Sequence, residues 1–208
     1  MSLPWDLFVS AFVTLLVVID PPGAAPIFAS LTARSSPEAR KAMAIRSVVI
    51  ASVILFGFAA VGEPFLRALG ISLDAFRVAG GIMLFLIALD MVFETRVKRR
   101  EERAKAVNDE ETEDVSVFPM AMPMIAGPGS IAAVMLLTGK AGDSVEKAAV
   151  YLALAIVLLL TLAALLAAGP IMRRIGAKVE GMITRLLGVI LAALAAQIVI
   201  DGLKGAFG

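Results

Sequence analysis

Ala148 to Ile171 reads AAVYLALAIVLLLTLAALLAAGPI, a run without a charged side chain. A helix needs roughly 20 apolar residues to cross the hydrocarbon core of a bilayer, and this run meets that length. A segment that spans lipid must be helical, because lipid offers no hydrogen-bond partner to exposed backbone groups. The stretch therefore predicts a transmembrane helix and an all-α membrane protein.

The composition of the whole chain extends this interpretation. Of its 208 residues 60% are hydrophobic and the mean hydropathy is +0.92, whereas a soluble domain has about 45–50% apolar residues. The charged residues gather between apolar runs, as connectors between spans do. We expect six transmembrane helices, near residues 5–31, 42–66, 73–93, 117–138, 148–171 and 181–207.

Two residue types are absent from the sequence. The chain contains no Cys and no His, and its formal net charge is +1. Disulfides, zinc sites with Cys or His ligands and histidine proton relays are therefore excluded, and the charge gives no indication of nucleic acid binding. We expect no cofactor and no metal. We also expect no enzymatic activity, because a nucleophile–base pair of the usual kind cannot be formed.

Basic residues are distributed unevenly between the two sides of this topology. Fourteen of the 19 Lys and Arg residues fall on the side of the first, third and fifth connectors, and five on the side of both termini. Since Lys and Arg favour the cytoplasmic side, we expect a multi-pass protein of the cell (inner) membrane with both termini outside. The charged segment 94–116 is then a cytoplasmic linker, with a partner-binding role as the alternative.

The chain also repeats itself at a shift of 106 residues. The matches that are least expected by chance in an apolar chain are Pro22 with Pro128, Gly23 with Gly129, Thr32 with Thr138, Pro64 with Pro170 and Gly70 with Gly176. Each half holds three spans, and an odd number forces the second half to enter the membrane from the opposite side. We therefore expect inverted three-helix repeats at 1–93 and 117–208, joined by the linker 94–116. Inverted repeats are typical of secondary transporters, although a duplication kept only for packing is the alternative.

The first span of each half is interrupted at corresponding places. The first interruption is Asp20-Pro-Pro-Gly-Ala-Ala-Pro26, and the second is Met122-Pro-Met-Ile-Ala-Gly-Pro-Gly-Ser130. Proline removes a backbone donor and glycine relaxes the backbone, so both helices should break. The half-helices that begin near Gly23 and Gly129 would then offer free N–H groups and a positive dipole end to an anion. Paired breaks of this kind indicate a binding site at membrane depth.

These two segments resemble the signature segments of the MarC family of integral membrane proteins. The resemblance covers the whole chain, including the six spans, the two halves and the charged central loop. It implies a carrier for small neutral amino acids of the glycine or alanine class, since the family includes such a transporter and is grouped with LysE-type exporters. The residues themselves lead only to a small solute.

Polar residues within the spans complete the set of candidates. The candidate substrate-binding residues are Asp20, Pro22, Gly23, Ala24, Thr32, Gly127, Gly129, Ser130 and Thr138. Asp20 and Asp90 are candidates for the coupling ion, because a charge at membrane depth is costly and usually functional. The alternatives are a helix cap for Asp20, an interfacial side chain for Asp90 and carbonyl caps for the two threonines. Asp74 lies three residues before Arg77, within reach of an ion pair on one helix face.

Taken together, the sequence predicts a secondary transporter that works by alternating access around the two breaks. Its partners would be a small neutral amino acid, membrane lipid and a coupling ion, either a proton or Na⁺. A channel or lipid-handling protein with re-entrant hairpins is the alternative. The direction of transport and a homo-oligomeric state stay open.

Overall fold

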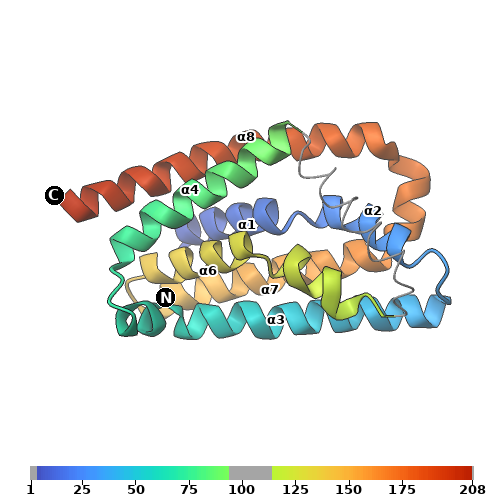
Figure 1. The fold of residues 1–208 in the computed structure, drawn as a ribbon, viewed down its shortest axis with the longest axis horizontal. Coiled ribbons are helices and arrows are strands. Elements are labelled where there is room, and N and C mark those ends of the chain that lie inside the picture. The colour runs from blue at the N-terminus through green and yellow to red at the C-terminus, as the bar shows by residue number, and fades with distance from the viewer. Residues whose placement is uncertain (1–3, 94–113, 208) are drawn as a thin grey trace.

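The computed structural model describes residues 4–93 and 114–207, with the backbone alone at 169–180 and 183. The first half contains α1 (Trp5–Ile19), α2 (Pro21–Leu31), α3 (Pro37–Ala68) and α4 (Leu73–Val92). The second half contains η1 (Ser116–Ile125), α6 (Pro128–Lys140), α7 (Ser144–Leu166) and α8 (Ala168–Phe207). Most of these helices run along the long axis of the molecule (Figure 1). Most of the linker predicted at 94–116 lies outside the described residues.

The described helices include five that are long and apolar enough to span a membrane. A bent pair of helices adds a sixth span if the two are counted together as one. The five are Trp5–Leu31, Pro37–Ala68, Leu73–Val92, Ser144–Leu166 and Thr184–Phe207, and the bent pair is η1 with α6, which meet at 51°. In Figure 1, α6 and η1 follow one another along the long axis, as α1 and α2 do. The all-helical membrane fold is confirmed, and N- and C-termini lie toward the same end of the bundle.

The region between the last two spans differs from the prediction. The fifth helix ends at Leu166 rather than near Ile171, and α8 begins at Ala168 and continues through the predicted loop to Phe207. Lys, Arg and Glu are good helix formers, and Pro170 falls in the first turn, where proline is tolerated. Charge therefore marks the end of the membrane segment here without ending the helix.

Side-chain caps fix where the long helices begin. Ser36 accepts a hydrogen bond from the Ala39 amide at 3.2 Å at the start of α3, and Ser72 accepts one from Ala75 at 3.1 Å at the start of α4. Asp143 accepts from two amides at 2.8 Å at the start of α7. Such caps satisfy N–H groups that a helix leaves unpaired at its first turn.

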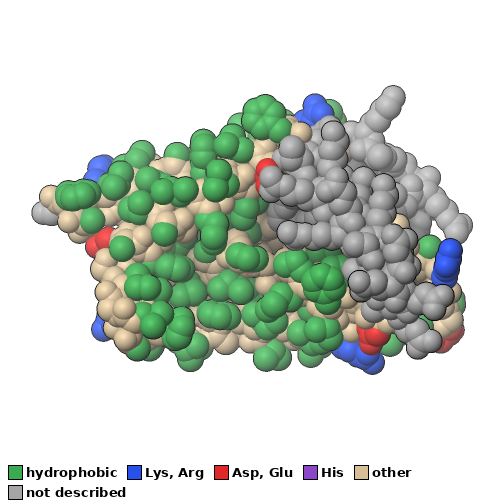
Figure 2. Space-filling view, viewed as in Figure 1, with side chains coloured by type: hydrophobic (Ala, Val, Ile, Leu, Met, Phe, Trp, Pro, Cys, Tyr) green, Lys and Arg blue, Asp and Glu red, His purple; other side chains and the backbone are tan. Residues whose placement is uncertain are grey.

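The surface of the bundle is apolar and several polar side chains are inside. Large hydrophobic side chains such as Val53, Leu159 and Leu186 are 70%, 64% and 62% exposed. On the face shown in Figure 2, hydrophobic side chains cover the middle, and most charges lie toward the two ends. Thr14 and Thr161 are buried by contrast. This distribution suits a lipid-facing exterior.

The helices pack in pairs that relate one half to the other. The most extensive pair is α4 with α8; α1 packs on α7 as η1 packs on α3, and α2 packs on α8 as α6 packs on α4. Glycine permits the closest approach: a Cβ on Gly188 of α8 would lie 2.9 Å from the Met91 Cβ of α4. The ion pair predicted between Asp74 and Arg77 is confirmed, with Oδ1 2.6 Å from Nη1.

Candidate functional site

Asp20 forms the first break. Its φ of 57° and ψ of 64° are left-handed, a region that aspartate tolerates better than most residues. Its amide donates to the Leu16 carbonyl at 2.9 Å and completes α1, while its carboxylate Oδ1 accepts from the Gly23 amide at 3.2 Å and caps α2. The side chain is 2% exposed. One buried acidic residue therefore ends one half-helix and begins the next.

The N-terminus of α2 is largely satisfied from within. Pro21 and Pro22 have no N–H group, the Gly23 amide bonds to the Asp20 carboxylate, and the Ala24 amide bonds to the Asp20 carbonyl at 3.0 Å. Gly23 has room for no side chain, because a Cβ there would lie 2.3 Å from Asp20 Oδ2. The amide predicted to meet a substrate carboxylate at Gly23 is thus already bonded to the residue that caps its helix.

The second break is built differently. Phe118 and Met122 have extended backbone angles inside η1, and each precedes a proline in a cis peptide bond. The chain then turns at Gly127 into α6, whose first residue is Pro128 and which has no side-chain cap. A Cβ on Gly127 would lie 2.4 Å from the Pro123 carbonyl oxygen. This half-helix therefore begins without a side-chain cap.

The two breaks lie next to each other in the interior. A Cβ on Gly129 would lie 3.4 Å from Cγ1 of Val18, which is two residues before Asp20, and 2.3 Å from Cδ1 of Ile87 on α4. Ser130 is 2% exposed. Figure 1 shows the α1–α2 and η1–α6 junctions at a similar position along the long axis of the bundle. The fold thus unites two interruptions that are about a hundred residues apart in sequence.

The remaining candidates around the breaks fall into two groups. Ala24 is fully buried beside Gly23, whereas Pro22 is exposed and points away from the interior. Asp90 is partly exposed and follows Ile87 by three residues, which places it on the same face of α4 one turn beyond the second break. Their roles in binding stay predictions.

The two repeat-related threonines bond to their own helices. The Thr32 hydroxyl donates to the Phe28 carbonyl at 2.7 Å, and the Thr138 hydroxyl donates to the Val134 and Met135 carbonyls at 2.9 and 3.1 Å. Both side chains are buried. A hydroxyl that donates to a carbonyl keeps acceptor capacity, so a substrate ammonium remains a suitable partner.

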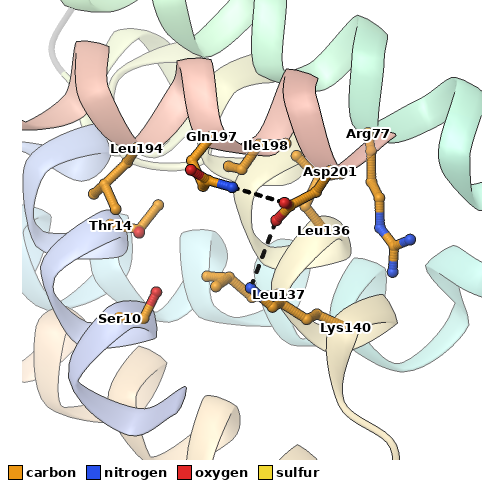
Figure 3. Close-up of a pocket in the computed structure, with 10 residues that line it drawn as sticks. All are labelled: Ser10, Thr14, Arg77, Leu136, Leu137, Lys140, Leu194, Gln197, Ile198 and Asp201. Atoms are coloured by element: carbon orange, nitrogen blue, oxygen red, sulfur yellow. Dashed lines mark hydrogen bonds and ion pairs between the residues drawn. The ribbon is translucent and has the colours of Figure 1, made fainter. Parts of the chain in front are cut away.

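A cavity of about 320 Å³ opens between α1, α6 and α8 toward the end that holds the termini. We call it the Lys140–Asp201 cavity, after the two charges that meet in it. Figure 3 shows Lys140 and Gln197 both directed at Asp201, with Ser10 and Thr14 of α1 across from them. Lys140 Nζ lies 3.9 Å from Asp201 Oδ2, and Gln197 Nε2 donates to Asp201 Oδ1 at 2.8 Å.

A second cavity of about 300 Å³ lies on the other side of α6, between α3 and α7. Thr138 lines it together with Glu63, Arg67, Lys147 and Tyr151. Glu63 and Arg67 pair at 2.6 Å, and the Tyr151 hydroxyl donates to the Ala59 carbonyl at 3.4 Å. The C-terminal half of α6 is therefore flanked by space on both sides.

The opposite end of the bundle is tied by arginines of α3. Arg40 Nη2 donates to the Thr32 carbonyl at 3.0 Å at the end of α2, and Arg46 pairs with Asp114 just before η1. Hydrogen bonding from Ser116, whose amide lies 2.9 Å from Oδ1, and the Arg46 charge lower the pKa of Asp114 below its ordinary value. These contacts attach α2 and η1, one half of each broken span, to α3.

The comparison with known proteins agrees with these motifs. A family model described as MarC family integral membrane protein matches residues 5–207. The chain belongs to the MarC family. A UPF0056 membrane protein of Methanocaldococcus jannaschii is 40% identical over 202 residues, which cover 96% of this chain and 97% of that protein. The UPF0056 membrane protein YvbG of Bacillus subtilis is 34% identical over 209 residues, covering 98% and 97%. No solved structure matches the chain.

The family match covers both breaks and all the spans.

The Lys140–Asp201 cavity was not predicted from the sequence. Lys140, Gln197 and Asp201 are not among the candidate residues that the sequence predicts. A signal was present, since Asp201 is an ionisable residue in a predicted span. Gln197 and Asp201, like Ser10 and Thr14, are also spaced four apart, which puts each pair on one helix face.

Proposed function

We propose that this MarC family protein is a secondary transporter of small neutral amino acids, of the glycine and alanine class, that works by alternating access. The observation that carries the proposal is the contact between two broken spans in the interior, where Gly129 of one meets Val18 beside the break of the other. Broken helices at membrane depth place backbone groups and dipole ends where a polar solute can use them.

The packing pattern supports an inverted repeat as the basis of the mechanism. Exchanging the halves turns the α1–α7 pair into η1–α3 and the α2–α8 pair into α6–α4. The α4–α8 pair maps onto itself under the same exchange. In the proposal, residues 1–93 and 117–208 are the two repeats, and one rocks against the other around the breaks.

The two breaks would take different ends of the substrate. The N-terminus of α6, with Gly129 and Ser130 in its first turn and no side-chain cap, suits the α-carboxylate. Asp20 is buried and acidic and suits the ammonium group or a coupling cation, a proton or Na⁺. Asp90 is the second candidate for the coupling ion.

The membrane setting of the proposal follows from the charge bias. The protein would lie in the cytoplasmic membrane, with both termini outside and the 94–116 segment inside. Substrate would then reach the two cavities beside α6 from the outer face. In this proposal the protein is a transporter and not an enzyme.

Uptake into proteoliposomes tests the function. Purified protein is reconstituted and the accumulation of labelled glycine and alanine is followed with and without gradients of H⁺ or Na⁺. Saturable uptake that a gradient drives supports a coupled carrier. Lipid scrambling is measured on the same vesicles, and scrambling without amino acid uptake would favour a lipid-handling protein instead.

A further inference from the structure

We propose that the Lys140–Asp201 cavity is a binding site for a small zwitterion, separate from the helix breaks. Its role as the first site on the transport path rests on the proposed function, whereas zwitterion binding rests on the cavity alone. The reasons are the pairing of its charges, its size and its position relative to the breaks.

The charges in the cavity match a molecule that carries one ammonium and one carboxylate. Lys140 and Asp201 come from different helices and lie 3.9 Å apart, at the outer limit of an ion pair. Arg77, the other cation on the cavity wall, is engaged by Asp74 at 2.6 Å. One lysine and one aspartate therefore remain to receive opposite ends of a ligand.

Opening the Lys140–Asp201 pair costs little. Their side chains are 62% and 39% exposed, and ion pairs between groups this exposed contribute little to stability. Gln197 holds the carboxylate of Asp201 in place at 2.8 Å, while the long lysine side chain can move aside. A zwitterion that enters between them replaces one weak contact with two charge-assisted hydrogen bonds.

The shape of the cavity limits the ligand to a small one. A volume of about 320 Å³ is at the lower end of the range of about 300–1,000 Å³ for small-molecule sites. Leu136, Leu137, Leu194 and Ile198 supply apolar walls, and they leave a short aliphatic group in apolar surroundings. A large or doubly charged ligand would leave polar atoms against these walls without partners.

The cavity also leads toward the breaks. Its inner wall includes Thr14, which lies one helical turn, about 6 Å, before Val18 on α1. Val18 in turn lies against Gly129 of the second break. The inner wall of the cavity is therefore about one turn of α1 from the second break, whereas Lys140 follows Gly129 by eleven residues of α6, roughly 16 Å.

Cysteine protection tests the site directly, because the native chain has no Cys. Ser10→Cys places a thiol on the cavity wall, and Lys204→Cys places one on the exposed surface of α8. The purified protein in detergent is treated with a cationic methanethiosulfonate reagent at increasing concentrations of alanine, ethylamine or propionate. Alanine should slow the modification of Ser10→Cys and leave that of Lys204→Cys unchanged. Ethylamine and propionate, with one charge each, should protect poorly.

Second substitutions in the Ser10→Cys background separate this cavity from the breaks. Asp201→Asn and Lys140→Gln should each raise the alanine concentration for half-protection by at least about tenfold, since each removes a charge-assisted contact. Asp20→Asn should leave protection intact, and Asp6→Asn is the control for a surface charge. Protection that survives Asp201→Asn, or ethylamine that protects as well as alanine, would overturn the proposal. Protection that Asp20→Asn abolishes would do the same, because it would then report closure at the breaks.

Failure of the proposed function gives a different result. If wild-type protein takes up no amino acid but alanine protects Ser10→Cys in an Asp201-dependent way, the cavity binds zwitterions and the transport proposal fails. If uptake is normal and no alanine concentration protects Ser10→Cys, the cavity proposal fails by itself.

Discussion

Substitution of Asp20 by Asn and by Ala separates its structural role from its charge. Asn keeps an oxygen that can accept the 3.2 Å bond from Gly23 and tolerates the left-handed φ of 57°. Ala loses the cap, which costs about 0.5–2 kcal/mol, and it occupies a backbone region that costs about 1–2 kcal/mol for an ordinary side chain. Asp20→Ala should therefore destabilise the fold by about 1.5–4 kcal/mol, and Asp20→Asn by well under that.

Transport should respond to the charge rather than to the cap. If the carboxylate neutralises a substrate ammonium or a coupling cation, its loss removes a buried charge-assisted contact worth about 2–5 kcal/mol. At about 1.4 kcal/mol per tenfold change, the apparent affinity should fall by at least about 30-fold. Asp20→Asn should thus be folded and defective, a combination that a cap alone does not explain.

Two measurements on the same preparations decide the matter. Thermal unfolding in detergent reports the stability of wild type, Asp20→Asn and Asp20→Ala, and uptake of labelled alanine into proteoliposomes reports transport. Asp6→Asn, an exposed acidic residue in the first turn of the same helix, is the matched control. Full uptake by Asp20→Asn would reduce Asp20 to a helix cap. Wild-type stability of Asp20→Ala would refute the cap.

Four further predictions use the same protein. Gly127→Ala should impair folding and transport, because its Cβ meets the Pro123 carbonyl at 2.4 Å, whereas Gly57→Ala has open space and should be neutral or stabilising by up to about 1 kcal/mol in thermal unfolding. Asn108→Cys should be labelled from the cytoplasmic side only, and labelling from outside intact cells would reverse the topology. Ethylamine should not compete with alanine for uptake; equal competition would exclude carboxylate recognition. The pKa of Asp114 is lowered in the folded protein, so its ionised carboxylate stabilises the fold. This stabilisation is fully present above the ordinary pKa of about 4 and is lost as the pH falls through the lowered value. Asp114→Asn should remove that part of the acid dependence of unfolding, and an unchanged profile would contradict it.

Local sequence predicted much of the fold because the relevant signals are short in range. Apolar runs of bilayer length fixed the spans, and clustered Pro and Gly located both interruptions. The ion pair between Asp74 and Arg77 was also local, since it depends only on a spacing of three residues along one helix. Each of these features needs information from a single helix.

Features that depend on tertiary structure or on one backbone angle were not predictable in the same way. Whether Asp20 faces a substrate or bonds back to Gly23 depends on its φ of 57°, which composition does not specify. Lys140 and Asp201 belong to helices that are neighbours only after the whole bundle has packed. The prediction for 171–181 also went wrong, because charged residues end a membrane span without ending a helix.

The difference between the two breaks gives the proposed mechanism its polarity. The positive end of α2 is already neutralised by the buried Asp20 carboxylate that caps it, so an additional anion there gains little and meets repulsion. The positive end of α6 has no such cap, so an anion there is stabilised by both the dipole and the amides of Gly129 and Ser130. Two breaks that correspond in sequence are therefore electrostatically opposite, and a substrate that bridges them must be dipolar. A zwitterion meets this requirement, whereas a simple cation or anion satisfies only one side.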